Sequence, residues 1–122
     1  MSAGQLYWND QLWVGNLEVA ATLPARMRGL LGRADLPVGQ GLLIEACGSV
    51  HTVGMRFALD VVFLDKAWRV RRVCQNVPPG RWLVWGGWHG LRALEVRAGW
   101  LKLAGVSPGT QLEWRTGAPG GA

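Results

Sequence analysis

The sequence predicts a mainly β fold of the α+β type, either a β-sandwich or a small, partly closed barrel, with one main helix packed on it. About seven or eight short apolar segments are separated by glycine and proline turns, which is typical of the strands of sandwiches and barrels. The 18 glycines supply residues that tolerate the positive φ of tight turns. Only one long segment has the apolar periodicity of a helix.

The first third of the chain is predicted to form two strands and then the helix. The strands Gln5–Trp8 and Leu12–Ala20 flank an Asn-Asp turn. Thr22 then serves as a helix N-cap, and Gly32 ends the helix. Apolar residues recur between them at the spacing of one helical face, so we expect the helix to pack on the sheet.

The rest of the chain is predicted to be strands and turns. Leu59–Leu64 has apolar side chains on both faces, with Asp60 among them, so we expect an interior strand that is covered on both sides. Further elements are the strands Leu42–Ile44, Trp68–Gln75, Arg81–Trp85, Leu91–Arg97 and Gln111–Trp114, and a short helical turn at Trp100–Ala104.

Length and composition predict one globular domain at 1–116, followed by a disordered tail of glycine, proline and other small residues at 117–122. The chain has 122 residues, 49% of them hydrophobic and 17% charged, as in a chain that folds around one core.

The formal charge of +5 favours anionic partners through long-range attraction. The basic residues are scattered along the chain, however, and no run is longer than Arg71-Arg72, which makes nucleic acid an unlikely partner. The N-terminus does not resemble a signal peptide, and no apolar window approaches the ~20 residues of a membrane span. We therefore expect a soluble, cytoplasmic protein.

Two cysteines, Cys47 and Cys74, are present at a spacing unlike that of zinc or redox motifs. A reducing cytoplasm would keep them as thiols, although cysteines on neighbouring strands could also pair. We expect no metal site and no cofactor.

Three longer motifs carry a family resemblance: residues 25–33 (ARMRGLLGR), 41–45 (GLLIE) and 49–65 (SVHTVGMRFALDVVFLD). Shorter motifs at 77–81, 94–99 and 107–109 follow in the same order. Together they resemble the bacterial and archaeal family named domain of unknown function 192, over most of the chain. The resemblance implies a compact, jelly-roll-like β domain with a helix after the second strand. It leaves the activity open, because the family has no established biochemical role.

The densest polar cluster is formed by Ser49, His51, Thr52, Arg56 and Asp60. In one interpretation the cluster orders the fold: Asp60 accepts hydrogen bonds from the backbone or from His51 and pairs with Arg56, because a buried carboxylate needs partners. In the other interpretation the cluster lines a ligand pocket. A Ser-His-Asp hydrolase is disfavoured, because the nucleophile-elbow and oxyanion signals are missing.

Eight tryptophans are many for this length. Trp13 and Trp68 fall in strand patterns, which favours a packing role. Trp85 and Trp88 flank Gly86-Gly87 in a predicted loop, where an exposed binding patch is the alternative.

The leading functional hypothesis is a non-catalytic binding module with a polar groove, which takes a small anionic or carbohydrate-like ligand or a protein partner. Two alternatives stay open: an enzyme in which His51 and Asp60 share proton transfer, and a weak single-stranded nucleic-acid binder. The oligomeric state is not predicted. The candidate ligand-binding residues are His51, Thr52, Met55, Arg56, Asp60, Trp85 and Trp88.

Overall fold

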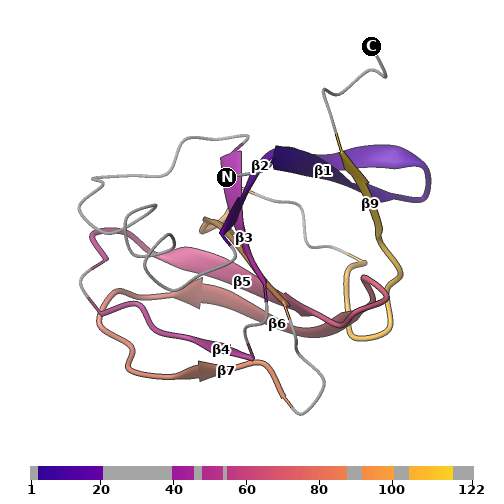
Figure 1. Ribbon diagram of the computed structural model, residues 1–122. Coiled ribbons are helices and arrows are strands. Elements are labelled where there is room, and N and C mark those ends of the chain that lie inside the picture. Colours follow the sequence, from indigo (N-terminus) through magenta and orange to yellow (C-terminus); the bar gives the residue numbers. More distant parts are fainter. Residues whose placement is uncertain are drawn as a thin grey trace.

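The computed structural model describes residues 3–20, 40–45, 48–53, 55–87, 92–100 and 105–116. Within these residues the chain forms nine strands and no helix, so the fold is mainly β. The strands are β1 (Ala3–Trp8), β2 (Gln11–Ala20), β3 (Gln40–Ile44), β4 (Ser49–Val50), β5 (Leu59–Leu64), β6 (Val70–Val77), β7 (Val84–Trp85), β8 (Arg92–Arg97) and β9 (Glu113–Thr116) (Figure 1).

Seven of these strands form one sheet in the order β6-β5-β8-β3-β2-β1-β9, and β4 pairs with β7 in a separate ribbon (Figure 1). Neighbours in the large sheet are antiparallel, except that β2 and β3 are parallel. Parallel neighbours require a crossover connection, which here is the segment 21–39.

The predicted helix over 22–32 belongs to this crossover and lies outside the described residues, as do most of the predicted turn at Trp100–Ala104 and the tail at 117–122. The described part of the chain is therefore mainly β, as predicted, but its large sheet is not closed and the predicted helix is not supported there. It also contains no helix long and apolar enough to cross a bilayer.

The large sheet is open, but its two edge strands meet at one end. Arg69 and Gln111 form an isolated antiparallel bridge just before β6 and β9. Beside it, the Val70 N–H donates to the Thr110 carbonyl (2.8 Å), and the Gly109 N–H donates to the Val70 carbonyl (2.7 Å). The rings of Trp68 and Trp114 stack at this junction with centroids 5.1 Å apart. The sheet thus curls until its edges touch, and they separate again along β6.

The curled sheet encloses a first core cluster, to which β1, β2, β3, β5, β6 and β8 contribute. Five tryptophans pack against this cluster: Trp8, Trp13, Trp68, Trp100 and Trp114. The packing role predicted for Trp13 and Trp68 is therefore confirmed.

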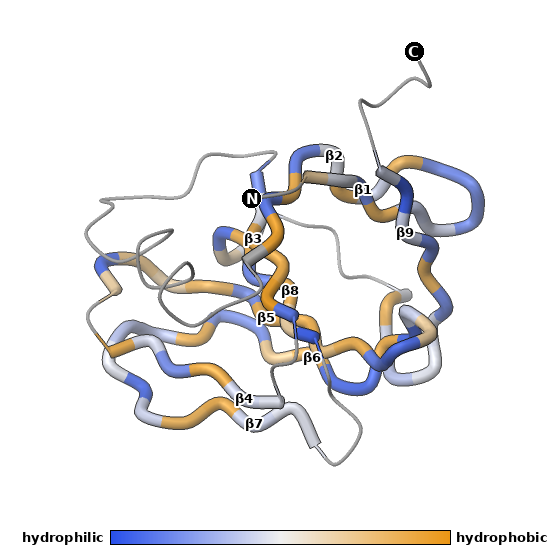
Figure 2. The backbone as a smooth tube through the Cα atoms, in the orientation of Figure 1, coloured by the Kyte–Doolittle hydropathy of each residue, from blue (hydrophilic) through white to orange (hydrophobic). Residues whose placement is uncertain are grey.

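A second core cluster lies on the other face of β3, β5 and β8, where the β4–β7 ribbon contributes Val50 and Val84. Every residue of β5 is buried. Val62 and Leu64 belong to the first cluster, whereas Leu59, Val61 and Phe63 belong to the second, as the two-faced pattern predicts. In Figure 2, β3 and β5 accordingly carry long hydrophobic stretches.

Gly86 allows the ribbon to lie directly on the sheet. A Cβ at this position would come within 2.6 Å of the Phe63 Cγ atom, so a larger residue would displace the ribbon or the ring. The Gly86 N–H also donates to the Gly48 carbonyl (2.9 Å), which continues the pairing beyond β4 and β7. The ribbon is thus held by Phe63 below it and by its own backbone.

Candidate functional site

Thr52 is completely buried and holds the loop that follows β6. Its hydroxyl donates to the Pro78 carbonyl (2.6 Å) and accepts from the Arg81 N–H (2.8 Å). Its backbone N–H donates to the Arg81 carbonyl, and its carbonyl accepts from the Gly80 N–H, both at 2.8 Å. Its hydrogen bonds are therefore directed at the protein's own Pro-Pro-Gly-Arg turn.

Asp60 is 3% exposed and accepts hydrogen bonds from two distant backbone groups. Oδ1 accepts from the Asn76 N–H (2.7 Å), and Oδ2 accepts from the Gly99 N–H (3.0 Å). Both donors have positive φ, 52° at Asn76 and 79° at Gly99. Asp60 thereby joins the end of β6 to the turn after β8.

The reason for the Asn76 contact is an irregularity in the pairing of β5 with β6. Leu59 pairs with Val77 and Val61 pairs with Cys74, so two residues of β6 lie opposite Asp60. Such a bulge takes a backbone N–H out of the ladder. The Asp60 carboxylate supplies the missing acceptor, as a buried donor requires.

His51 and Arg56 do not join Asp60. Among the described residues, no hydrogen bond or ion pair connects the Asp60 carboxylate to either side chain. The Nδ1 atom of half-buried His51 is inaccessible and has no partner in the described part of the chain. The hydrogen bonds of Asp60 therefore fit an ordering role, carried by backbone donors, as one form of the prediction allowed, and the expected pairing with Arg56 is not present among the described residues.

His51 lies instead on the outer face of the β4–β7 ribbon. Val50 pairs with Val84, and Thr52 is bonded to Arg81, so His51 is held across from residues 82 and 83. Because successive residues of a strand face opposite sides, the burial of Val50 and Val84 turns their neighbours outward. His51, Leu83 and Trp85 accordingly share the solvent side.

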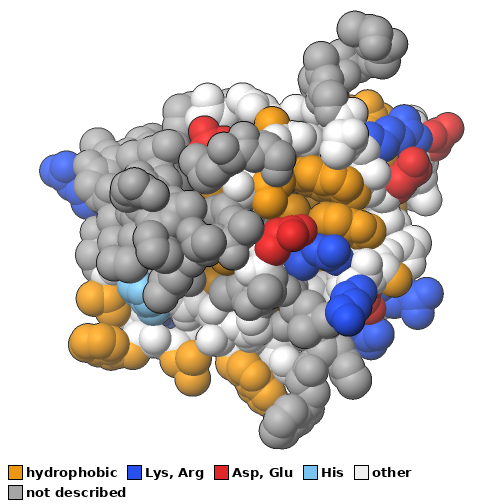
Figure 3. All heavy atoms as spheres, in the orientation of Figure 1, with side chains coloured by type: hydrophobic (Ala, Val, Ile, Leu, Met, Phe, Trp, Pro, Cys, Tyr) orange, Lys and Arg blue, Asp and Glu red, His pale blue; other side chains and the backbone are white. Residues whose placement is uncertain are grey.

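Three large hydrophobic residues in the segment 82–85 are exposed: Trp82, Leu83 and Trp85, at 83%, 63% and 45%. One further large hydrophobic residue of the described chain is exposed, Leu12 at 48%. Figure 3 shows hydrophobic side chains protruding along the lower edge of the molecule, where Figure 1 draws the ribbon. We refer to these three residues as the ribbon patch.

The remaining predicted site residues are divided between core and surface. Met55 packs against the second core cluster, Arg56 is exposed, and Trp85 belongs to the ribbon patch. Trp88 lies outside the described residues. Trp82 and Leu83 were missed as site residues, although the Pro-Pro-Gly turn just before them signals that the strand pattern of 81–85 is interrupted.

Three arginines of the described chain, Arg71, Arg92 and Arg115, are paired with carboxylates. Arg115 contacts Asp10 (2.7 Å) and Glu113 (3.0 Å), and its guanidinium lies over the Tyr7 ring. These carboxylates raise the pKa of Arg115, and its guanidinium lowers the pKa of Glu113. The positive charge of Arg115 is therefore locally compensated.

Arg92 and Arg71 are compensated in the same way. Arg92 bonds Glu45 (3.3 Å) and covers the Trp68 ring, while Arg71 bonds Asp65 (2.8 Å). Burial alone would raise the pKa of Asp65, but backbone donors and the Arg71 guanidinium outweigh it, and the pKa of Asp65 lies below its ordinary value. Arg71, Arg92 and Arg115 therefore do not account for the net positive charge, because each is neutralised by a carboxylate.

In the part of the chain that the structure describes, no group of three His, Cys, Asp or Glu residues converges as a metal site would require. Cys74 is a free, half-buried thiol against the second core cluster, and Cys47 lies outside the described residues.

The open seven-stranded sheet and its covering ribbon define a small, mainly β domain, and the motifs of the sequence resemble the DUF192 family. A sequence model of that family, described as an uncharacterized ACR, matches residues 7–114. The chain belongs to this family, as its motifs predict. No curated protein is similar in sequence.

Two solved structures resemble the whole domain. A protein of unknown function from Novosphingobium aromaticivorans DSM 12444 has a TM-score of 0.75 at 21% identity, over 92% of this chain and 84% of that one. A protein from Sinorhizobium meliloti 1021, described as a "putative transcription regulator", has a TM-score of 0.76 at 23% identity, over 93% and 92%. At these identities the likeness establishes the fold.

Proposed function

We propose that this domain is a non-catalytic binding module that recognises another protein through the ribbon patch. The observation that carries the proposal is the exposure of Trp82, Leu83 and Trp85 within four consecutive positions. Exposed large apolar residues that lie together mark interaction surfaces more often than isolated ones do. Tryptophan is also the residue type most enriched among the side chains that dominate binding energy.

The chemistry of the patch favours a protein over a small anion or a carbohydrate. Leu83 offers neither a charge nor a hydrogen bond, and Thr52 directs its hydroxyl at the protein's own backbone. Exposed Arg81 directly precedes the patch in the chain, so a basic side chain lies at its border. An apolar centre with a basic rim is suited to a partner that presents an apolar side chain flanked by acidic groups.

The alternative of an enzyme using His51 and Asp60 has less support. A general acid or base must lie within hydrogen-bond reach of the proton that it transfers. Both Asp60 oxygens accept backbone N–H groups, and the described contacts of Asp60 do not include His51. Asp60 is also nearly inaccessible to a substrate.

Nucleic-acid binding also ranks below protein binding. The name of the Sinorhizobium neighbour raises this possibility for that protein. In this chain Arg71, Arg92 and Arg115 are engaged with carboxylates of the same domain. Phosphate contacts at these three arginines would have to replace the existing ion pairs.

The proposal is tested by selecting binders from a displayed library of random peptides on the immobilised domain. We expect selected peptides to lose at least tenfold in affinity when Trp82 and Trp85 are both changed to Ala, because exposed anchors contribute to binding more than to folding. Leu12→Ala is the matched control, since Leu12 is exposed outside the patch. Equal binding to the wild type and the double variant, or a selection that returns no binder, would overturn the proposal.

A further inference from the structure

A second surface lies at the free edge of the large sheet. Among the described residues, β6 is the last strand in the sheet order and pairs with β5 alone. Its first residue, Val70, is already bonded to Gly109 and Thr110. Near its end, the N–H of Asn76 is directed to Asp60. In the part of the chain that the structure describes, the outer edge of residues 71–75 pairs with no strand, and an unpaired strand edge is a template for another strand.

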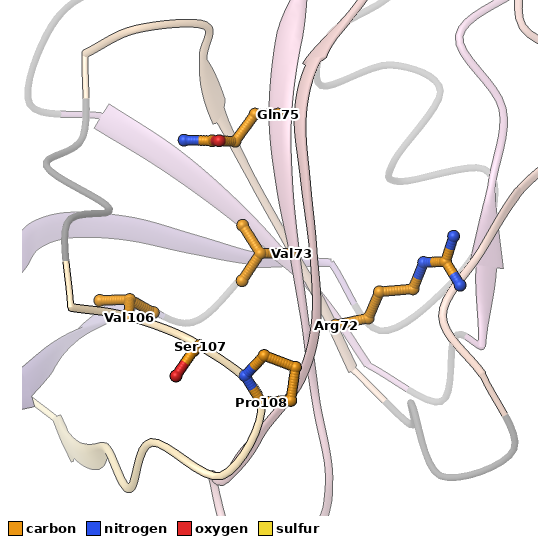
Figure 4. Close-up of a pocket in the computed structure, with 6 residues that line it drawn as sticks. All are labelled: Arg72, Val73, Gln75, Val106, Ser107 and Pro108. Carbon is orange, nitrogen blue, oxygen red and sulfur yellow. The ribbon is translucent and has the colours of Figure 1, made fainter.

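A groove of about 380 Å³ runs beside this edge and is lined by Arg72, Val73, Gln75, Val106, Ser107 and Pro108. Figure 4 shows the side chains of Val73 and Gln75 on the side of the strand that faces residues 106–108, and the Arg72 side chain on the opposite side. The groove begins where the edges of the sheet separate after their junction at Val70. An added strand would therefore bury every second side chain against Val73, Val106 and Pro108.

The charges at this edge indicate which kind of strand would bind there. Arg71 is paired with Asp65, whereas the guanidinium of exposed Arg72 has no ion pair in the described part of the chain. A second copy of this chain paired through this edge would add another Arg71 and Arg72 and so increase the net positive charge there. An acidic side chain on the outward face of an added strand would instead neutralise Arg72.

We infer that the open edge of β6 binds an extended segment of another protein by strand addition, with apolar side chains in the Val73–Pro108 groove and acidic side chains beside Arg72. Backbone hydrogen bonds to residues 71–75 hold the bound segment, and the fit of its alternating side chains to the groove and to Arg72 gives specificity. This surface is separate from the ribbon patch and does not depend on the function proposed for that patch.

The probe is a fluorescent peptide of about eight residues that alternates valine with aspartate, enough to span the open edge at ~3.3 Å per residue. Binding is measured by fluorescence anisotropy with the complete chain. We expect Arg72→Glu to weaken binding at least tenfold. Lys66→Glu is the matched control, because Lys66 is exposed in the turn before β6 and the change in net charge is the same. It should weaken binding less than twofold. Ser107→Trp fills the groove from its exposed side and should also weaken binding at least tenfold.

Two modified peptides separate strand addition from general attraction. A peptide with lysine in place of aspartate, and one with methylated backbone nitrogens at the valines, should each bind at least tenfold more weakly. Absence of binding of the aspartate peptide at millimolar concentration would overturn the inference. The inference would also be wrong if Lys66→Glu and Arg72→Glu weakened binding equally, or if the methylated peptide bound as well as its parent. Sedimentation of the chain as a dimer that Arg72→Glu dissociates would contradict it as well.

Discussion

Asp60 offers the sharpest test of how this fold is held together. Its carboxylate is the described acceptor for the N–H groups of Asn76 and Gly99, at 2.7 Å and 3.0 Å. Asp60→Asn keeps the size of the side chain but leaves one acceptor oxygen, and it directs an amide N–H₂ group at the other donor. The substitution therefore separates the hydrogen bonds from the packing.

The expected cost follows from one lost bond. A hydrogen bond to a charged group contributes about 1.5–3 kcal/mol, and a buried donor left without an acceptor costs about 1–3 kcal/mol. Asn also removes the cost of burying a charge at a site that is 3% exposed, which offsets part of the loss. We expect the free energy of unfolding to fall by about 2 kcal/mol in Asp60→Asn, and by about twice as much in Asp60→Ala.

Urea unfolding followed by tryptophan fluorescence measures this difference as a shift of the midpoint at an unchanged m-value. Asp10→Asn is the matched control: the Asp10 side chain is 88% exposed and its bond to Arg115 is a surface ion pair, so its loss should cost less than about 1 kcal/mol. If Asp60→Asn stayed within about 0.5 kcal/mol of the wild type, the carboxylate would not be an ordering group and the reasoning above would be wrong.

Two further predictions concern the core and acid stability. Phe63 is fully buried and packs against Gly86, so Phe63→Ala should lower the free energy of unfolding by about 3–5 kcal/mol, and a loss below about 1 kcal/mol would contradict its place in the second core cluster. The pKa of Asp65 is lowered in the folded state, so its contribution to stability is complete above the ordinary value of 3.8 and is lost as pH falls through the lower folded value. Acid titrations followed by circular dichroism should therefore show the wild type losing more stability than Asp65→Asn below about pH 4, and parallel curves would refute the assignment.

Local patterns were sufficient for the strands that contribute most to the core. The apolar side chains on both faces of Leu59–Leu64 predicted an interior strand, and every residue of β5 is buried between the two core clusters. A turn joins it to the next predicted strand, since the Trp68 N–H donates to the Asp65 carbonyl. The short strand β4 was not predicted, and β7 is shorter than the predicted Arg81–Trp85. The backbone of Arg81 is bonded to Thr52, and this contact depends on tertiary packing.

The candidate site was only partly accessible from the sequence. The proximity of Ser49, His51, Thr52, Arg56 and Asp60 along the chain suggested one polar cluster. The fold disperses it: Thr52 bonds the loop after β6, Asp60 bonds Asn76 and Gly99, and Arg56 is exposed. Closeness in sequence does not set direction, since adjacent strand residues face opposite sides.

The sequence by itself determined the mainly β class, the family and the buried position of β5, because these depend on periodicity, turn residues and motifs that act over a few positions. It also determined that the Asp60 carboxylate needed partners, since a buried charge is costly without them. Only the tertiary structure decided which partners these are, because the two donors lie 16 and 39 positions away and are brought to Asp60 by a bulge and a turn. It likewise decided that Trp82 and Leu83 are exposed and that β6 ends the sheet, because exposure and strand order follow from which segments pack together over long separations.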